Sequence, residues 1–287
     1  MNEQRISVVT GATGGIGYET ALALAKMGDR VILLNRNEEK SKHAVDQIQE
    51  ATRHEQVDYV IADLASLASV RAAAAEIKNR LERLDVLINN AGTWFSKQTL
   101  TEDGIEMQLA VNHVAPFLLT HLLLPLLLQS EDGRIINVSS DTHARGRIRL
   151  DDLEFKKGYH GIKSYGRSKL AMVQCTYELS ERLEGTNVTV NAVQPGLVKT
   201  DIGHKATIGL HSVAWWFRKL GGVPPEKGAE TNIYLATSPE AKGVSGKYWD
   251  KCQPKPSSKR SYDRDMQKKI WEVSMDMAGI ENYIPEQ

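Results

Sequence analysis

The chain has 287 residues, 41% of them hydrophobic, which is enough to bury a substantial core in one α/β domain. Its 36 basic residues balance 36 acidic ones, so no net charge draws it to nucleic acid or to an anionic membrane surface. The expected partners are therefore small molecules and other copies of the same chain.

Short apolar runs alternate with helical patterns along the chain. The runs carry little polar alternation, which is typical of parallel strands covered by helices on both faces. Six strands and one edge strand, about seven in all, predict a Rossmann-type, doubly wound parallel sheet with ligands at the carboxyl ends of its strands. In chain order, we expect strand 6–9, helix 16–27, strand 31–34, helix 38–51, strand 57–61, helix 67–84, strand 86–88, helix 104–129, strand 135–138, helix 165–183, strand 188–192 and edge strand 245–249.

No linker or repeat divides the chain, so residues 1–287 are expected to form one domain, with residues 253–287 as a C-terminal tail or extension. Residues 1–5 are polar and lead directly into the first strand, which is not the layout of a signal peptide. The most apolar later stretch, residues 117–128, contains Pro125 and is shorter than the roughly 20 residues of a membrane span. We expect a cytoplasmic protein without a membrane span.

No metal site is expected. Cys175 and Cys252 fit neither a disulfide framework nor a zinc spacing, which indicates a reducing compartment. The isolated histidines, including His113, His143 and His204, have no spacing that a metal ion would require. They are interpreted as solvated or packing residues.

A glycine-rich string follows the first strand and opens the first helix. Glycines there let the backbone turn tightly and approach a pyrophosphate, whose charge then lies on free amides at the positive end of the helix dipole. The string fits both Thr-Gly-x-x-x-Gly-x-Gly and Thr-Gly-x-x-Gly-x-x-Gly, and the loop alone does not choose between them. The expected phosphate-binding residues are Gly11, Thr13, Gly14, Gly15, Ile16 and Gly17.

The second strand ends in Asn35 and Arg36, at the place where an NAD-binding protein usually has an acid for the ribose hydroxyls. A neutral side chain followed by a guanidinium suits a 2′-phosphate, because guanidinium makes charge-assisted hydrogen bonds to phosphate. The pair predicts that NADP(H) is preferred over NAD(H).

Tyr165 and Lys169 are four residues apart at the start of an apolar helix, which puts the phenol and the ammonium on one face. A phenol exchanges protons poorly at neutral pH unless a nearby positive charge stabilises the phenolate. Tyr159 and Lys163 have the same spacing, but Gly161 interrupts them, so Tyr165 and Lys169 are preferred. Upstream, the strand 135–138 ends in Ser139 and Ser140, of which alternation lets only one face the site.

Together with these residues, further motifs make the chain resemble the short-chain dehydrogenase/reductase superfamily, and within it the retinol dehydrogenase-like group. The resemblance runs in the family's order from about residue 6 to about residue 279. The motifs that carry it are Asp63-Leu64, Asn89-Asn90-Ala91-Gly92, Asn112, and the run Pro195, Gly196, Leu197, Val198, Lys199 and Thr200.

The resemblance implies a role for each matching residue. Tyr165 would be the acid in reduction and the base in oxidation, and Lys169 would assist it while binding the nicotinamide ribose. Ser140 would hydrogen-bond the substrate oxygen, and Asn112 would hold a water that connects Lys169 to solvent. The remaining coenzyme contacts would be Asp63, Leu64, Asn89, Ala91, Gly92, Pro195, Gly196, Val198 and Thr200.

The resemblance also implies that residues 204–222 form a lid over the substrate. Trp215, Trp216 and Phe217 in this segment suggest a bulky apolar alcohol, aldehyde or ketone, although packing of these residues on the core or on another subunit is the alternative. Competing functions are an extended-type nucleotide-sugar epimerase or dehydratase, and a non-catalytic NADP-binding regulatory protein. The helices 104–129 and 165–183 resemble those that form dimers in the family, so a homodimer is possible.

Overall fold

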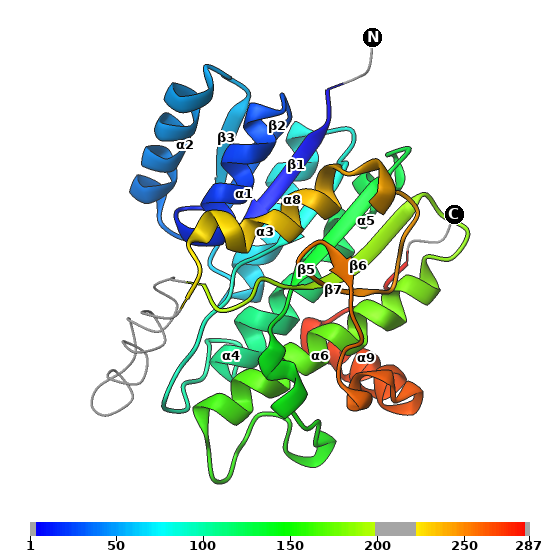
Figure 1. Ribbon diagram of the computed structural model, residues 1–287. Coiled ribbons are helices and arrows are strands. Elements are labelled where there is room, and N and C mark those ends of the chain that lie inside the picture. Colours follow the sequence, from blue (N-terminus) through cyan, green and yellow to red (C-terminus); the bar gives the residue numbers. More distant parts are fainter. Residues whose placement is uncertain (1–3, 199–221, 285–287) are drawn as a thin grey trace.

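The computed structural model describes residues 4–198 and 222–284. It is centred on an eight-stranded sheet in the order β3-β2-β1-β4-β5-β6-β7-β8, in which only β7 and β8 pair antiparallel (Figure 1). This confirms the expected Rossmann-type fold. The strands are β1 (Ile6–Thr10), β2 (Arg30–Asn35), β3 (Val57–Ile61), β4 (Val86–Asn89), β5 (Gly133–Val138), β6 (Val188–Gln194), β7 (Tyr248–Asp250) and β8 (Gln253–Pro254).

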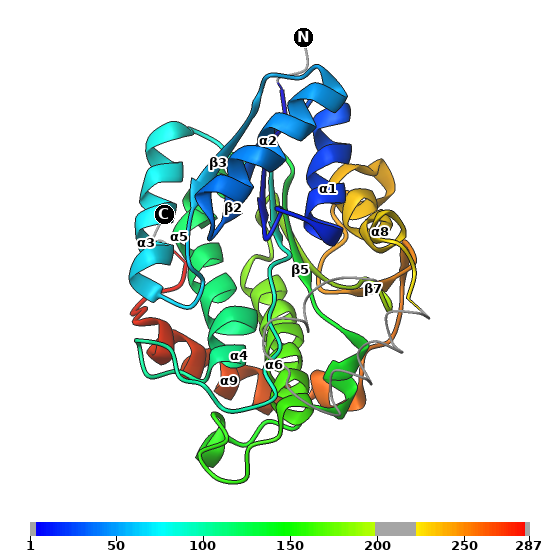
Figure 2. The ribbon, with the colours of Figure 1, turned by 90° about the vertical axis from the view of Figure 1, so that its left-hand side faces the viewer.

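Helices cover both faces of the sheet (Figure 2). On one face lie α1 (Gly15–Lys26), α2 (Glu38–Thr52) and α8 (Pro225–Thr237); on the other lie α3 (Leu67–Arg80), α5 (Ala115–Leu128) and α6 (Gly161–Arg182). Successive residues of a strand pack into opposite cores, because their side chains alternate between the two faces of the sheet. Val8, for example, packs with the α3, α5 and α6 layer, whereas Val9 packs with the α1, α2 and α8 layer.

The helix expected over residues 104–129 starts later and changes its winding. Gly104 has φ +77°, in a turn, and the chain becomes helical only at α4 (Met107–Leu109), where the Glu106 carboxylate accepts a hydrogen bond of 2.8 Å from the Leu109 amide. A π-helical turn, Ala110–Val114, then leads into α5. The turn's extra residue shifts the side chains that follow, and π-turns often mark functional sites.

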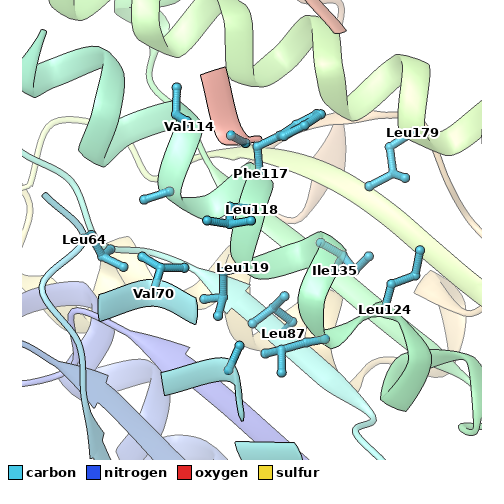
Figure 3. Close-up of a cluster of buried hydrophobic side chains, with 14 of the residues drawn as sticks. Leu64, Val70, Leu87, Val114, Phe117, Leu118, Leu119, Leu124, Ile135 and Leu179 are labelled. Atoms are coloured by element: carbon cyan, nitrogen blue, oxygen red, sulfur yellow. The ribbon is translucent and has the colours of Figure 1, made fainter. Parts of the chain in front are cut away.

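From Met107 to Leu128 these segments make up the single helix, among residues 4–198 and 222–284, that is long and apolar enough to cross a membrane. Of its most apolar window, 72% is buried inside the fold. Figure 3 shows Phe117, Leu118 and Leu119 of α5 in one cluster with Leu87 of β4. We therefore interpret residues 107–128 as a core helix in the layer that α3, α5 and α6 form.

The described C-terminal residues, up to 284, form packed structure rather than a tail. After β8 comes α9 (Arg264–Ala278), which Asp263 caps by accepting a 3.1 Å hydrogen bond from the Met266 amide. α9 lies beside α6 (Figure 1), and its Trp271 is 1% exposed. β8 and α9 were not expected from the sequence: β8 has only two residues, and the α9 pattern has no neighbouring element to indicate which partner its apolar side would cover.

Candidate active site

The glycine loop has the geometry of an anion cradle. A Cβ atom on Gly17 would lie 2.4 Å from the Gly11 carbonyl oxygen, and one on Gly11, whose φ is +67°, would lie 2.9 Å from Ala91 Cα. The loop can therefore pack this closely only with glycine at both positions. Gly14 is the N-cap of α1 and provides no side-chain cap, and Thr13 and Gly14 are exposed. The first amides of α1 are thus open to a phosphate at the positive end of the helix.

Thr10 and Asn90 hold this loop against the end of β4. The Thr10 hydroxyl accepts hydrogen bonds from the amides of Asn90 (3.0 Å) and Ala91 (2.9 Å). The Asn90 side chain donates to the carbonyl oxygens of Thr10 (2.8 Å) and Gly11 (3.2 Å). The sequence assigned neither residue a role, although Thr10 begins the glycine-rich string and Asn90 lies in the motif Asn89-Asn90-Ala91-Gly92.

The end of β2 supports the loop and offers a cation beside it. Asn35 is 5% exposed, and its Oδ1 accepts a 2.6 Å hydrogen bond from the Ala12 amide; its Nδ2 is buried with no partner among the described residues. The Arg36 side chain is 65% exposed and lies 3.8 Å from the Asp63 carboxylate. A free buried donor, a glycine cradle and an exposed guanidinium fit a phosphorylated dinucleotide.

Two residues expected at the coenzyme turn their side chains into the protein. Leu64 is 8% exposed in the larger core. Asn89 is 1% exposed, and its Nδ2 donates to Thr120 Oγ1 (3.0 Å) and Asn137 Oδ1 (2.9 Å). Asn89 thus ties β4 to α5 and β5 and positions the backbone at the carboxyl edge of the sheet.

Lys169 lies at the junction of α6 and β5. It is 2% exposed, and its Nζ donates a 2.7 Å hydrogen bond to the Val138 carbonyl oxygen. The same Nζ lies 5.9 Å from the centre of the Tyr165 ring. Burial lowers the pKa of Lys169 to about 7. A group with this pKa can hold or release a proton near neutral pH.

Asn112 connects the π-turn to α6 and to the loop after β4. Its Oδ1 accepts a 2.7 Å hydrogen bond from the Thr93 amide, and its Nδ2 donates to the Thr93 carbonyl oxygen (3.0 Å) and to Ser168 Oγ (3.1 Å). Because Ser168 precedes Lys169 in the sequence, this hydrogen bond attaches Asn112 to the turn of α6 that carries the lysine. Asn112 is fully buried.

The two serines at the end of β5 differ in their surroundings. Ser139 is 2% exposed and its hydroxyl donates a 3.2 Å hydrogen bond to the Lys169 carbonyl oxygen. Ser140 is partly exposed and begins a short helical turn, Asp141–Arg145, in which its Oγ accepts a 3.2 Å hydrogen bond from the Thr142 amide. Of the two, Ser140 has the hydroxyl that a substrate can reach.

The second tyrosine–lysine pair is not built like the first. Tyr159 lies before α6 and donates a 2.9 Å hydrogen bond to the buried Glu106 carboxylate, while Lys163 is exposed. Burial, and then the Glu106 charge, raise the pKa of the Tyr159 phenol. Tyr165 lies on α6, one turn before the buried Lys169. The surroundings of the two pairs agree with the preference for Tyr165.

The segment after β6 lies on the start of α1. Gly196 has φ +79°, and Val198 pairs with Val223 in an isolated bridge. A Cβ on Gly228 would lie 2.6 Å from a Val198 methyl group and 3.1 Å from an Ile16 methylene. The remaining predictions for this segment, Thr200 and the lid 204–222 with His204, Trp215, Trp216 and Phe217, lie outside the described residues except for Gly222.

The two described histidines singled out above are both buried. His113 Nε2 lies 2.7 Å from Ser274 Oγ of α9, and burial lowers the pKa of His113 to about 3. The His143 ring contacts the Ser140 carbonyl oxygen and is 3% exposed. Within the described part of the chain, His, Cys, Asp and Glu side chains form no group that could hold a metal ion.

Comparison with known proteins identifies the family. The model of the family described as short chain dehydrogenase matches residues 5–209. Retinol dehydrogenase 14 of Mus musculus is 42% identical over 289 residues, covering 95% of this chain and 85% of that protein. An uncharacterised protein from Mycobacterium paratuberculosis shares the fold with a TM-score of 0.79 and 31% identity, covering 98% of this chain and 96% of that one. A short-chain dehydrogenase from Escherichia coli complexed with NADPH has a TM-score of 0.66 and 27% identity, covering 87% of this chain and 97% of that one.

These matches agree with the site's geometry. The chain belongs to the short-chain dehydrogenase/reductase family, in its retinol dehydrogenase-like group, and is an NAD(P)-dependent oxidoreductase that acts on CH–OH groups.

Proposed function

We propose that the protein is an NADP(H)-dependent reductase or dehydrogenase of a mainly apolar alcohol, aldehyde or ketone. The observation that carries the proposal is the buried Lys169, held by Val138 beside the Tyr165 ring at the end of the sheet where the glycine loop lies. The coenzyme, when bound, supplies or accepts the hydride. The protein's own residues manage the proton and the charge on the substrate oxygen.

Each residue of the site has a distinct task in this proposal. In reduction, the Tyr165 hydroxyl donates its proton to the carbonyl oxygen as negative charge develops there, and in oxidation the phenolate takes that proton back. The Ser140 hydroxyl donates a hydrogen bond to the same oxygen, which is strongest when the oxygen is most negative. Lys169, when protonated, supplies positive charge near the phenol, and Asn112 holds the π-turn against Ser168 so that this part of α6 stays in place.

The apolar substrate class is supported by the rim of the site. Leu197 is 40% exposed and Val223 is 42% exposed, and the Val223 amide donates a 2.7 Å hydrogen bond to the Leu197 carbonyl oxygen, so the two lie together. They flank the segment proposed to cover the substrate. Retinol dehydrogenase 14, the relative described above, is named for an alcohol that is mostly hydrocarbon.

The preference for NADP(H) is supported by Arg36 and by the related Escherichia coli structure that holds NADPH. A guanidinium gains charge-assisted hydrogen bonds to a 2′-phosphate but has no such partner in NADH. One charged hydrogen bond is worth about 1.5 to 3 kcal/mol, and about 1.4 kcal/mol is tenfold in rate. The wild type should therefore prefer NADPH by at least about tenfold in kcat/KM.

The test compares NADPH and NADH at one ionic strength, with a panel of ketones and aldehydes followed by nicotinamide absorbance. Arg36→Leu should remove most of the preference by lowering kcat/KM for NADPH while changing that for NADH by less than about twofold. Arg36→Lys keeps the charge and should fall between the two proteins. Asn35 is left unchanged because it holds the loop through Ala12. A wild type that prefers NADH, or an Arg36→Leu protein with unchanged preference, would contradict the NADP assignment.

A further inference from the structure

The His143 side chain joins two segments that are far apart in the sequence. Its Nδ1 lies 2.7 Å from the Ser140 carbonyl oxygen, and its Nε2 lies 3.0 Å from the Ser258 amide nitrogen. A carbonyl oxygen only accepts and an amide N–H only donates, so Nδ1 bears the hydrogen and Nε2 accepts. The neutral ring is 3% exposed and its centre lies 4.8 Å from that of the Tyr248 ring. Both nitrogens are therefore committed to fixed partners.

On one side, His143 fixes the peptide that follows the candidate catalytic serine. The Ser140 carbonyl oxygen accepts a second hydrogen bond, of 3.1 Å, from the His143 amide. Both donors belong to His143, and together they restrict rotation of that carbonyl group. Fixing the carbonyl group fixes the backbone at Ser140 and therefore the direction of its Cα–Cβ bond, from which the hydroxyl extends; the Oγ itself accepts from the Thr142 amide.

On the other side, His143 meets a segment anchored on α6. Ser257 Oγ lies 2.6 Å from the Tyr177 hydroxyl, and the Arg260 carbonyl oxygen accepts a 3.0 Å hydrogen bond from Gln174 Nε2. The rings of Tyr177 and Tyr262 stack with centres 5.4 Å apart. Residues 257–262 are thus attached to α6, the helix that carries Tyr165 and Lys169.

We propose that His143 is a positioning residue, which holds Ser140 in a fixed position relative to Tyr165. It does so by linking the turn Asp141–Arg145, which Ser140 begins, to residues 257–262, which are attached to α6. The proposal rests on the proposed function, in which both hydroxyls must reach one substrate oxygen. Ser140 and Tyr165 come from different elements, and β5 approaches α6 from the inside of the fold through Ser139. His143 adds a further connection to α6, through residues 257–262. Hydroxyls that act on one atom must be held within a fraction of an ångström for full catalytic effect.

Two substitutions separate the two hydrogen bonds of His143. Asparagine places an amide near the position of Nδ1 and can still donate to Ser140, but it does not reach Ser258. Glutamine places an amide oxygen near Nε2 and can still accept from Ser258, but it loses the donor at Nδ1. If the link as a whole positions Ser140, His143→Asn and His143→Gln should each lower kcat by about tenfold or more, with KM for NADPH changed by less than about twofold.

The matched control is His121→Gln, which removes the ring Nδ1 donor of His121. Its Nδ1 lies 2.7 Å from the Tyr283 carbonyl oxygen, so this histidine also joins the body of the protein to its C-terminal region. It lies on α5 and bonds neither Ser140 nor residues 257–262. Its kcat should stay within about twofold of wild type, whereas any general loosening of the C-terminal region would lower it.

The tautomer gives a readout that does not depend on turnover. In ¹⁵N NMR of the wild type, His143 should show a protonated Nδ1 and an unprotonated Nε2. The opposite tautomer, or variants that lose thermal stability while kcat per folded molecule stays unchanged, would overturn the positioning role and leave the proposed function standing. A wild type with the expected tautomer but no turnover of any carbonyl substrate with either coenzyme would overturn the proposed function, and the positioning role with it.

Discussion

At the scale of single residues, surroundings decide between side chains that a pattern treats alike. Tyr159 and Tyr165 each precede a lysine by four residues, yet only Tyr165 lies on a helix with a buried lysine one turn later. Tyr159 instead donates to Glu106, and its phenol pKa is raised, the opposite of what proton transfer at neutral pH requires. Tyr159 therefore anchors the segment that precedes α6, and Tyr165 remains the candidate for proton transfer.

We expect Tyr165→Phe to abolish turnover while NADPH binding stays nearly intact, because the change removes the proton donor without touching the glycine loop. Tyr159→Phe should keep most of kcat but lose about 1 to 3 kcal/mol of stability, because the buried Glu106 loses a hydrogen bond. Steady-state kinetics, coenzyme titration by fluorescence and denaturant unfolding measure the three quantities. An inactive Tyr159→Phe protein beside an active Tyr165→Phe protein would reverse the assignment.

At the scale of elements, caps determine where a helix begins and ends. α2 begins where Asn37 accepts a 2.8 Å hydrogen bond from the Lys40 amide, and it ends at Arg53 in the left-handed conformation, with φ 55° and ψ 28°. The Arg53 amide still donates a 2.7 Å hydrogen bond to the Gln49 carbonyl oxygen. A residue with a Cβ atom is strained in this conformation, which glycine adopts freely.

Arg53→Gly should therefore stabilise the protein. The left-handed conformation costs about 1 to 2 kcal/mol for a residue with a Cβ atom, and the greater freedom of glycine in the unfolded chain offsets about 0.5 to 1 kcal/mol of the gain. A net increase of about 0.5 to 1 kcal/mol in the free energy of unfolding follows, measurable in urea. Arg53→Ala retains the Cβ atom and should show no gain. Equal gains for both variants would instead trace the effect to the lost arginine side chain.

At the scale of the whole molecule, the C-terminal helix closes the layer that contains α5 and α6. Trp271 of α9 packs edge-on against Phe117 of α5, with ring centres 4.9 Å apart, and the Arg182 guanidinium of α6 lies 4.7 Å from the centre of the Trp271 ring. Tyr283 completes the aromatic cluster and donates a 2.9 Å hydrogen bond to the Phe117 carbonyl oxygen. The faces of α5 and α6 that meet α9 are thus covered by the chain itself, so a homodimer would have to use other surfaces.

Trp271→Ala should cost about 3 to 5 kcal/mol of stability, because it empties a fully buried site between two helices. Trp271→Phe should cost much less, since the indole Nε1 is buried with no hydrogen-bond partner in residues 4–198 and 222–284, so no such bond is lost. Urea unfolding compares the free energies, and light scattering at matched concentration reports whether the exposed α5–α6 face begins to self-associate. Equal costs for the two variants would show that the cluster depends on the indole itself.

Much of this protein is determined locally and can be predicted from its sequence. The predicted strands all occur, within about two residues at most ends, because a parallel strand buried on both faces must be a short apolar run between turn residues. The glycine loop could be predicted because tight backbone approach leaves glycine as the residue that fits. The predicted start of a helix at residue 104 was wrong, because the chain becomes helical only at Met107. The elements α8, β8 and α9 were not predicted, because their sequence patterns are short or weak, or because the elements they pack against are remote in the chain.

Tertiary structure decided what depends on contacts between distant segments. It placed Ser139 against Lys169 and left Ser140 accessible, turned Leu64 and Asn89 inward, and gave His143 its partner at Ser258. A motif states which residue types recur at which spacing, and spacing within one helix or strand determines direction only along that element. Which side chain is buried, which pKa shifts and which hydroxyl stays accessible are set by the elements that pack against it, and these come together only in the folded chain.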